Sequence, residues 1–234
     1  MYLRAGRAAR TSYDARKPVA FHSRLVQRTS SAVCSETVRV TRVSSLRIAF
    51  IIGSTRPDRV GPTIAEWAFD HATRRGDASY DLIDLVHVGL PLLDEPEPAA
   101  AHHYRHDHTK RWSRLIDSYD GFVFVAPEYN RGVSAALKNS IDYLYAEWND
   151  KAAGLICYGS SGGLRAGEQL KSTLGEVQIA TVRAQVSLSI YDDMVDFAQL
   201  APRDYQVGNL DAMLDSLLRW AAAMRALRAG LVSP

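Results

Sequence analysis

The sequence predicts an α/β protein, a three-layer sandwich in which helices cover both faces of a five-stranded parallel sheet. Short apolar segments alternate with helical periodicities from residue 46 to the end of the chain. The apolar segments are rich in branched residues and show no apolar/polar alternation, which is typical of strands buried on both faces. Strands that alternate with helices need crossover connections and therefore form a parallel sheet.

Five segments are predicted as strands. Each is short, apolar and bounded by turn-forming or charged residues. Cys157 falls within the fourth strand and is expected to be a small core residue. In chain order the strands span residues 46–52, 80–85, 121–125, 153–158 and 182–189.

Helices are predicted between the strands from apolar residues that recur every three or four positions. After the third strand, apolar residues recur at helical spacing as far as Trp148. After the fourth strand, a further helix is predicted to end near residue 177. The first helix carries Ile64, Trp67, Ala68 and Ala72, the third-strand helix carries Val133, Leu137, Ile141, Leu144 and Trp148, and the terminal helix carries Leu210, Leu214, Leu217, Ala221 and Met224.

Right-handed crossovers leave few topologies, and we expect the strand order 2-1-3-4-5. In such a sheet, ligands bind beyond the carboxyl ends of the strands, where the strand order reverses. The loops after the first, third and fourth strands are therefore the expected binding site.

Composition is that of an ordinary globular protein, with 234 residues, 47% apolar and 23% charged. No apolar run approaches the roughly 18 residues that span a bilayer, so we expect no membrane segment. The two cysteines, Cys34 and Cys157, lie far apart in the sequence. This usage suits a reducing compartment, so a cytoplasmic location is expected and a cysteine-rich zinc module is excluded.

The net charge of +2 is unevenly distributed. Residues 1–47 hold ten basic and two acidic side chains, whereas the rest hold 18 basic and 24 acidic ones. The body is thus mildly acidic, and we expect no nucleic-acid partner. Residues 1–45 are predicted to be a basic, poorly ordered extension, with a transit peptide or a misassigned start as alternatives. Residues 46–234 are predicted to form a single domain.

The first loop has the features of an anion site. Gly53 permits a tight exit from the strand, and Ser54 offers a hydroxyl. The start of the next helix supplies free N–H groups and a positive dipole end. Arg56 adds a forked donor suited to phosphate, and Arg59 is a second candidate. The loop has neither a P-loop nor a G-x-G-x-x-G pattern. The alternative is a capped turn with arginines facing solvent.

The third loop, Pro127–Gly132, combines a stiff proline with the aromatic face of Tyr129 and the amide of Asn130. These groups suit a flat heteroaromatic ring with hydrogen bonds on its rim. The fourth loop, Tyr158–Gly163, formally matches the G-x-S-x-G of serine hydrolases, with Ser161 as nucleophile. All seven histidines precede Ser161, however, whereas that fold needs a later histidine. The small residues of this loop are better explained by a planar ligand that lies against exposed backbone than by a serine hydrolase site.

Together the three loops resemble the NADPH-dependent FMN reductase family, of flavodoxin-like fold. The similarity covers residues 46–200, through GSTRPDR, DLVHVGLPLLDEP, APEYNRGVSAALKNSIDYL and YGSSGGLRAGEQL. It implies that the phosphate of FMN is held at the first loop and that the other two loops line the ribityl chain and the isoalloxazine. The residues so implied are Ser54, Arg56, Arg59, Val60 and Gly61 for the phosphate, and Pro127, Glu128, Tyr129, Asn130, Ser160, Ser161, Gly162 and Gly163 for the rest.

The resemblance also implies an activity. FMN would accept a hydride from NADPH or NADH and pass two electrons to a small-molecule acceptor such as a quinone or flavin, in a ping-pong cycle. No catalytic acid or base is proposed, because the cofactor carries the chemistry. A homodimer or homotetramer is expected. Two alternatives stay open: a flavodoxin-like electron-transfer protein without a nicotinamide site, and an FMN-binding protein without turnover.

Two further polar clusters stand out in the sequence. If residues 102–108 were helical, His102 and His106 would share a face and could form a weak metal site. We expect instead a solvated lead-in, with His103 and His108, to the helix that contains Trp112 and Ile116. No metal is therefore predicted. Asp192, Asp193 and Asp196, after the fifth strand, are expected to form a solvated acidic loop or a lid.

Overall fold

The computed structural model describes residues 45–231, and its five-stranded parallel sheet has the order β2-β1-β3-β4-β5. This confirms the predicted fold class and strand order. The predicted basic extension, residues 1–45, lies outside the described part of the chain except for Ser45. The strands are β1 (Arg47–Ile52), β2 (Ser79–Asp84), β3 (Gly121–Pro127), β4 (Lys151–Gly159) and β5 (Ile179–Ser189).

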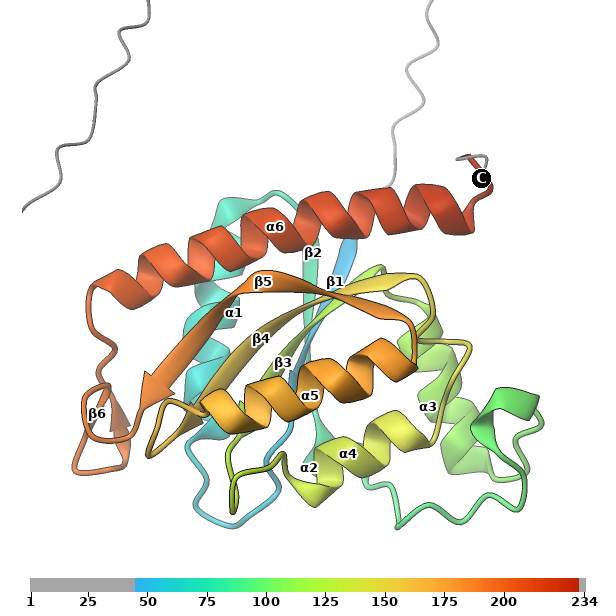
Figure 1. Cartoon of the computed structure of the whole chain (residues 1–234), viewed down its shortest axis with the longest axis horizontal. Helices are drawn as coiled ribbons and strands as arrows, with labels where there is room; N and C mark the ends of the chain where they lie inside the picture. Colours follow the sequence, from blue (N-terminus) through green and yellow to red (C-terminus); the bar gives the residue numbers. More distant parts are fainter. Residues whose placement is uncertain (1–44, 232–234) are drawn as a thin grey trace, which may run out of the picture. The chain divides into compact units, whose positions relative to one another are not determined.

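Helices cover both faces of the sheet, and a short hairpin follows β5 (Figure 1). The hairpin pairs β6 (Met194–Val195) with β7 (Gln199–Leu200). The helices are α1 (Gly61–Arg75), α2 (Leu85–Val88), α3 (Asp107–Asp117), α4 (Ala135–Asp142), α5 (Leu164–Glu176) and α6 (Tyr205–Arg228), with a 3-10 turn at Ala99–Ala101.

The core is divided by the sheet into two halves. Helices α1 and α6 pack on one face through residues such as Ile64 and Leu214, and α3, α4 and α5 pack on the other through residues such as Trp112 and Ile141. Every residue of the central strands β3 and β4 is buried. This burial on both faces explains why those strands appear in the sequence as continuous apolar runs.

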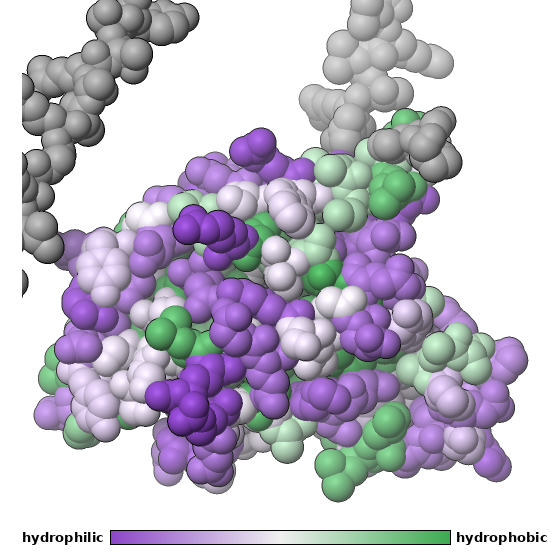
Figure 2. Space-filling model, viewed as in Figure 1, coloured by the Kyte–Doolittle hydropathy of each residue, from purple (hydrophilic) through white to green (hydrophobic). Residues whose placement is uncertain are grey.

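The surface is mixed in character. Figure 2 shows hydrophilic and hydrophobic groups interspersed on the face that carries α5 and α6. Within residues 45–231, no helix has both the length and the apolar character that a bilayer crossing requires.

The predicted helix after β3 is shorter in the structure than in the sequence pattern. Helix α4 ends at Asp142, before Leu144 and Trp148, which nevertheless are almost fully buried. The indole N–H of Trp148 donates to the carbonyl of Ile141 at 3.1 Å and so satisfies a carbonyl of the last helical turn. The chain therefore leaves the helix in tight turns that keep the apolar stripe against the sheet.

The second strand ends one residue earlier than predicted, at Asp84 rather than at Leu85. The carboxylate of Asp84 accepts from the backbone N–H of Val86 at 3.1 Å and caps the N-terminus of α2. This cap turns Leu85 into the first residue of a helix.

The histidine-rich segment leads into α3 as expected, but it is not helical between His102 and His106. His102 follows the 3-10 turn and His106 is the N-cap of α3, so the two do not form an i, i+4 pair on a helix. Their neighbours bind carboxylates instead: His103 lies 3.2 Å from Glu97, and the ring of His108 lies 3.0 Å from Asp94.

The prediction of a solvated acidic loop after β5 is wrong for Asp193. Asp192 and Asp196 are exposed, but the side chain of Asp193 is fully buried. Its carboxylate accepts from the backbone N–H groups of Ser189 (2.8 Å) and Arg203 (3.0 Å), and the Arg203 guanidinium lies 3.0 Å away. Burial raises the pKa of Asp193, but these hydrogen bonds outweigh it and hold that pKa below its usual range.

We expect Asp193→Asn to destabilise the fold by about 2 kcal/mol at pH 7, because charge-assisted hydrogen bonds are lost. The lowered pKa means that the ionised carboxylate contributes stability above its unfolded pKa of roughly 4, and that this stability is lost as the pH falls through the folded value. Urea unfolding between pH 7 and 3 should therefore show a smaller acid loss in the variant than in wild type. An equal loss of unfolding free energy with falling pH in the variant and in wild type would contradict this role.

Candidate flavin site

The three unusual loops meet at one edge of the sheet. They follow β1, β3 and β4, which are consecutive neighbours in the strand order (Figure 1). Because parallel strands carry their carboxyl ends at the same edge, the loops lie side by side there. The hydroxyl of Ser134 ties two of them together, since it donates to the carbonyl of Gly53 and accepts from the N–H of Leu137 at 3.2 Å.

Two buried hydroxyl groups, those of Ser54 and Tyr158, lie close together beneath the first loop. Ser54 is fully buried, and its Oγ makes no hydrogen bond of good geometry within residues 45–231. The hydroxyl of Tyr158, at the end of β4, is also buried and has the Ser54 hydroxyl as a neighbour without a hydrogen bond of good geometry. Both oxygens face Gly61, where a Cβ would overlap Ser54 Oγ and lie 2.8 Å from the Tyr158 hydroxyl. Buried hydroxyls without a well-formed hydrogen bond are costly, so this pair favours a polar group nearby.

The N-terminus of α1 opens toward the same place. Val60 occupies the N-cap position, and no side chain caps the first turn. The free backbone N–H groups and the helix dipole therefore favour an anion there. Arg56 is exposed beside this turn and makes no ion pair among the described residues. Arg59 differs, because its guanidinium binds the carboxylate of Asp84, and both side chains are largely buried.

The loop after β3 forms a tight two-residue turn. Tyr129 and Gly132 exchange backbone hydrogen bonds of 2.9 and 3.0 Å, and the two residues between them, Asn130 and Arg131, have φ angles of 50° and 71°. This is the conformation of a type I′ turn, in which asparagine is favoured. The turn leaves the ring of Tyr129 exposed at the rim of the cavities.

Glu128 does not point its carboxylate at an open ligand position. The carboxylate accepts from the N–H groups of Arg165 (3.1 Å) and Ala166 (3.4 Å) at the start of α5, and the Arg165 guanidinium lies 2.9 Å away. Burial raises the pKa of Glu128, but these partners outweigh it and lower that pKa below its usual range. Glu128 therefore links the loop after β3 to the N-terminus of α5.

The loop after β4 requires glycine at two consecutive positions. Gly162 and Gly163 have φ angles of 68° and 67°, in the left-handed region that glycine tolerates. At Gly163 a Cβ would overlap the backbone nitrogen of Tyr158. The loop thus folds back tightly on its own strand and leaves Ser160 at the rim of the cavity.

Two adjoining cavities, of about 380 and 610 Å³, open between these loops. Arg56, Glu128 and Tyr129 line both of them. The lining of the smaller one combines two arginines with apolar and aromatic residues. It is bounded by Arg56, Asp58, Arg59, Val60, Pro127, Glu128, Tyr129, Tyr158, Gly159, Ser160, Ile190, Phe197 and Ala198.

The structure thus brings most of the predicted site residues together. Ser54 and Gly61 lie beneath the first loop and not on the cavity surface. Ser161, Gly162 and Gly163 do not line the cavities either: the two glycines are buried, and the exposed Ser161 accepts through its hydroxyl from Arg165 at 3.2 Å. The sequence prediction missed Tyr158, Ile190, Phe197 and Ala198 as site residues. The aromatic residue that ends the fourth strand was the one available signal for Tyr158.

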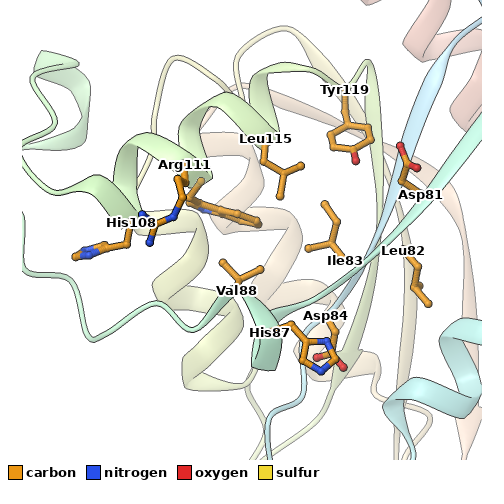
Figure 3. Close-up of a pocket in the computed structure, with 11 residues that line it drawn as sticks. Asp81, Leu82, Ile83, Asp84, His87, Val88, His108, Arg111, Leu115 and Tyr119 are labelled. Carbon is orange, nitrogen blue, oxygen red and sulfur yellow. The ribbon is translucent and has the colours of Figure 1, made fainter.

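A separate cavity of about 500 Å³ lies against the free edge of β2 (Figure 3). In Figure 3, His87 and Val88 come from α2, and Arg111 and Leu115 come from α3. It contains none of the predicted site residues. The acidic groups along its β2 wall already have partners, because Asp81 pairs with Arg47 and Asp84 pairs with Arg59. The three-loop edge is therefore the better candidate.

The protein is a five-stranded flavodoxin-like sandwich. At the sheet edge where the strand order reverses, it has a turn suited to an anion and a cavity with an aromatic lining. These features define a class of proteins that bind flat cofactors with a phosphate group. The family model of the NADPH-dependent FMN reductases matches residues 46–193, and the chain belongs to that family.

Two relatives agree with this assignment, and a solved structure agrees with the fold. The chain is 42% identical over 134 residues to the NAD(P)H-dependent FMN reductase ntnL of a Nectria species, covering 55% of this chain and 67% of that one. It is 37% identical over 151 residues to the NAD(P)H-dependent FMN reductase C4B3.06c of Schizosaccharomyces pombe, covering 64% and 76%. The flavoenzyme FerB of Paracoccus denitrificans has the same fold, with a TM-score of 0.58, 21% identity and coverage of 76% and 98%.

The protein is thus an NAD(P)H-dependent FMN reductase, an oxidoreductase with FMN as cofactor and NAD(P)H as electron donor. This confirms the function, the cofactor and the donor expected from the resemblance. Its electron acceptor is a small molecule.

Proposed function

We propose that the FMN phosphate binds at the N-terminus of α1 and that the isoalloxazine occupies the cavity between the three loops. The observation that carries the proposal is the uncapped start of α1 beside the cavity, where Arg56 is exposed and makes no ion pair among residues 45–231. A phosphate there would accept from backbone N–H groups near Val60 and Gly61 and from Arg56, and the buried Ser54 hydroxyl would support this turn from beneath.

The roles of the other site residues follow from their positions. Tyr129 and Ser160 would flank the flat ring, because both lie at the rim of the smaller cavity. Pro127 and Asn130 would line the adjoining walls. Glu128, Ser161, Gly162 and Gly163 would act indirectly, by holding the loops after β3 and β4 in place. Arg59 would contribute positive potential while it is anchored on Asp84.

We further propose a quinone as the acceptor. The chain is 32% identical over 116 residues to the 2-hydroxy-1,4-benzoquinone reductase of a Burkholderia species, covering 47% of this chain and 56% of that one. Bound FMN supplies a carrier that can take a hydride from NAD(P)H and release two electrons to a second substrate. The protein's own part is to bind and orient both substrates at one cavity, which implies a ping-pong order.

The decisive experiment is an anaerobic half-reaction with FMN-loaded protein. One equivalent of NADPH or NADH should bleach the flavin absorbance without an acceptor, and one equivalent of quinone should restore it. Riboflavin, which lacks the phosphate, should bind far more weakly than FMN and serves as the control. If dithionite reduces the bound flavin but neither NADPH nor NADH does, the proposal is contradicted. That result would favour a flavodoxin-like electron-transfer protein instead.

The quaternary state and the compartment stay predictions. A homodimer or homotetramer would place a second copy near the cavity, and light scattering of the FMN-loaded protein tests it. The cytoplasmic location is tested by fractionation of the source cells.

A further inference from the structure

The β6–β7 hairpin borders the smaller cavity of the flavin site. Phe197 and Ala198, at its tip, line that cavity together with Ile190 from the segment before it. The family match ends at residue 193, so the hairpin from Met194 to Leu200 lies just beyond it. The hairpin is thus an element of this chain that the family match does not describe.

The tip of the hairpin holds an aromatic residue in an unfavourable conformation. Asp196 and Phe197 have φ angles of 50° and 57°, and the N–H of Ala198 donates to the carbonyl of Val195 at 3.1 Å. Glycine or asparagine is favoured at such positions, and a bulky side chain there is unusual. Backbone strain of this kind often accompanies a binding role.

The base of the hairpin is fixed firmly. The buried carboxylate of Asp193 binds the backbone at Ser189 and at Arg203, on the two sides of the hairpin. The carbonyl of Asp193 accepts from the N–H of Ala201 at 2.8 Å, and Met194 is buried against the α6 side of the core. A fixed base allows the tip to present a side chain in a defined place.

The ring of Phe197 is available for a ligand. The residue is 61% exposed, and its ring meets the exposed ring of Tyr191 edge-to-face, with 5.8 Å between the ring centroids. Tyr129, on the loop after β3, lines the same cavity. Aromatic side chains on two loops of one cavity suit a flat ring that stacks on, or meets, their faces.

We propose that Phe197 determines acceptor specificity and that it selects planar aromatic quinones over acceptors with no flat ring. The proposal rests on the function proposed above, in which NAD(P)H, a proton and the quinone give NAD(P)⁺ and the hydroquinone. Phe197 takes no part in the electron transfer. It binds the ring of the oxidised acceptor beside the flavin position.

The test compares two acceptors on FMN-loaded protein with NADPH: 2-methyl-1,4-naphthoquinone, which is planar, and ferricyanide, which is not. The measured quantity is the ratio of kcat/KM for the quinone to kcat/KM for ferricyanide. We expect Phe197→Ala to lower this ratio about 3- to 10-fold, the range for loss of one aromatic contact. Phe197→Tyr should keep most of the wild-type ratio.

Two further variants separate binding from folding. Phe197→Gly should lower the ratio as Phe197→Ala does, while its thermal stability is equal to or above that of wild type, since glycine tolerates the turn. Val195→Ala, an exposed change on the same hairpin but off the cavity, should keep the ratio. An unchanged ratio in Phe197→Ala, or an equal fall in Val195→Ala, would overturn the assignment. A wild-type protein that binds no FMN or oxidises no NADPH would instead overturn the proposed function.

Discussion

Gly163→Ala should destabilise the fold by more than about 3 kcal/mol. The left-handed conformation of Gly163 costs an alanine about 1–2 kcal/mol. In addition, the new Cβ would overlap the backbone nitrogen of Tyr158 and lie 2.8 Å from the carbonyl carbon of Cys157. Both belong to the fully buried strand β4, which cannot shift without opening the core. Urea unfolding followed by circular dichroism measures the loss.

Two glycines of the same region supply the controls. Gly162 has a similar φ of 68°, but there a Cβ would first meet Ser187 at an ordinary 3.4 Å. Gly162→Ala should therefore cost only the conformational strain, about 1–2 kcal/mol. Gly175, inside α5, has open space around it, and Gly175→Ala should stabilise by about 0.5–1 kcal/mol. Equal losses for Gly162→Ala and Gly163→Ala would show that the close approach to β4 is not what matters.

Arg56→Ala should weaken FMN binding by about 1–3 kcal/mol, which is roughly 5- to 150-fold. Arg56 is exposed, lines both cavities and has no ion-pair partner among residues 45–231, so its guanidinium can bind a phosphate without losing another contact. The affinity is measured by flavin fluorescence titration of the apoprotein. Because the site is open to solvent, the difference should shrink as salt is added.

The ligand itself supplies the first control for Arg56. Riboflavin affinity should change little in Arg56→Ala, since the lost contact is to the phosphate. Arg56→Lys should bind FMN more tightly than Arg56→Ala but less tightly than wild type, because lysine keeps the positive charge and lacks the forked hydrogen-bond donors of the guanidinium. Arg74→Ala, at the far end of α1, should leave FMN binding as in wild type. Equal weakening of FMN and riboflavin would reject the phosphate assignment for Arg56.

Most of the fold could be predicted from local pattern. The continuous apolar runs of β1, β3 and β4 predict buried parallel strands, and the crossover rule then leaves the strand order found here. The errors fall at the ends of elements. Trp148 continues the apolar stripe of α4 although the helix stops at Asp142, because an indole N–H replaces the next turn of the helix.

Charge partners were harder to predict than elements. Asp193 looks like one of three loop acids in the sequence, yet it is buried against Arg203, ten residues later. Arg59 and Glu128 look like ligand-facing groups, yet they bind Asp84 and the start of α5. Hydrophobic periodicity predicts which face of a helix or strand is buried. It does not predict which charged side chains of different loops lie close enough to pair with one another.

The fold class, the strand order and the three loops that meet at one edge are all predictable from the chain's residue pattern, because they depend on local periodicity and on the handedness of crossovers. The folded chain was needed to show that the Ser54 and Tyr158 hydroxyls face the same glycine and that Phe197 lines the cavity. Those relations join segments that are far apart in the chain, so they depend on how the strands align and on where each side chain points, and no short pattern of residues encodes them.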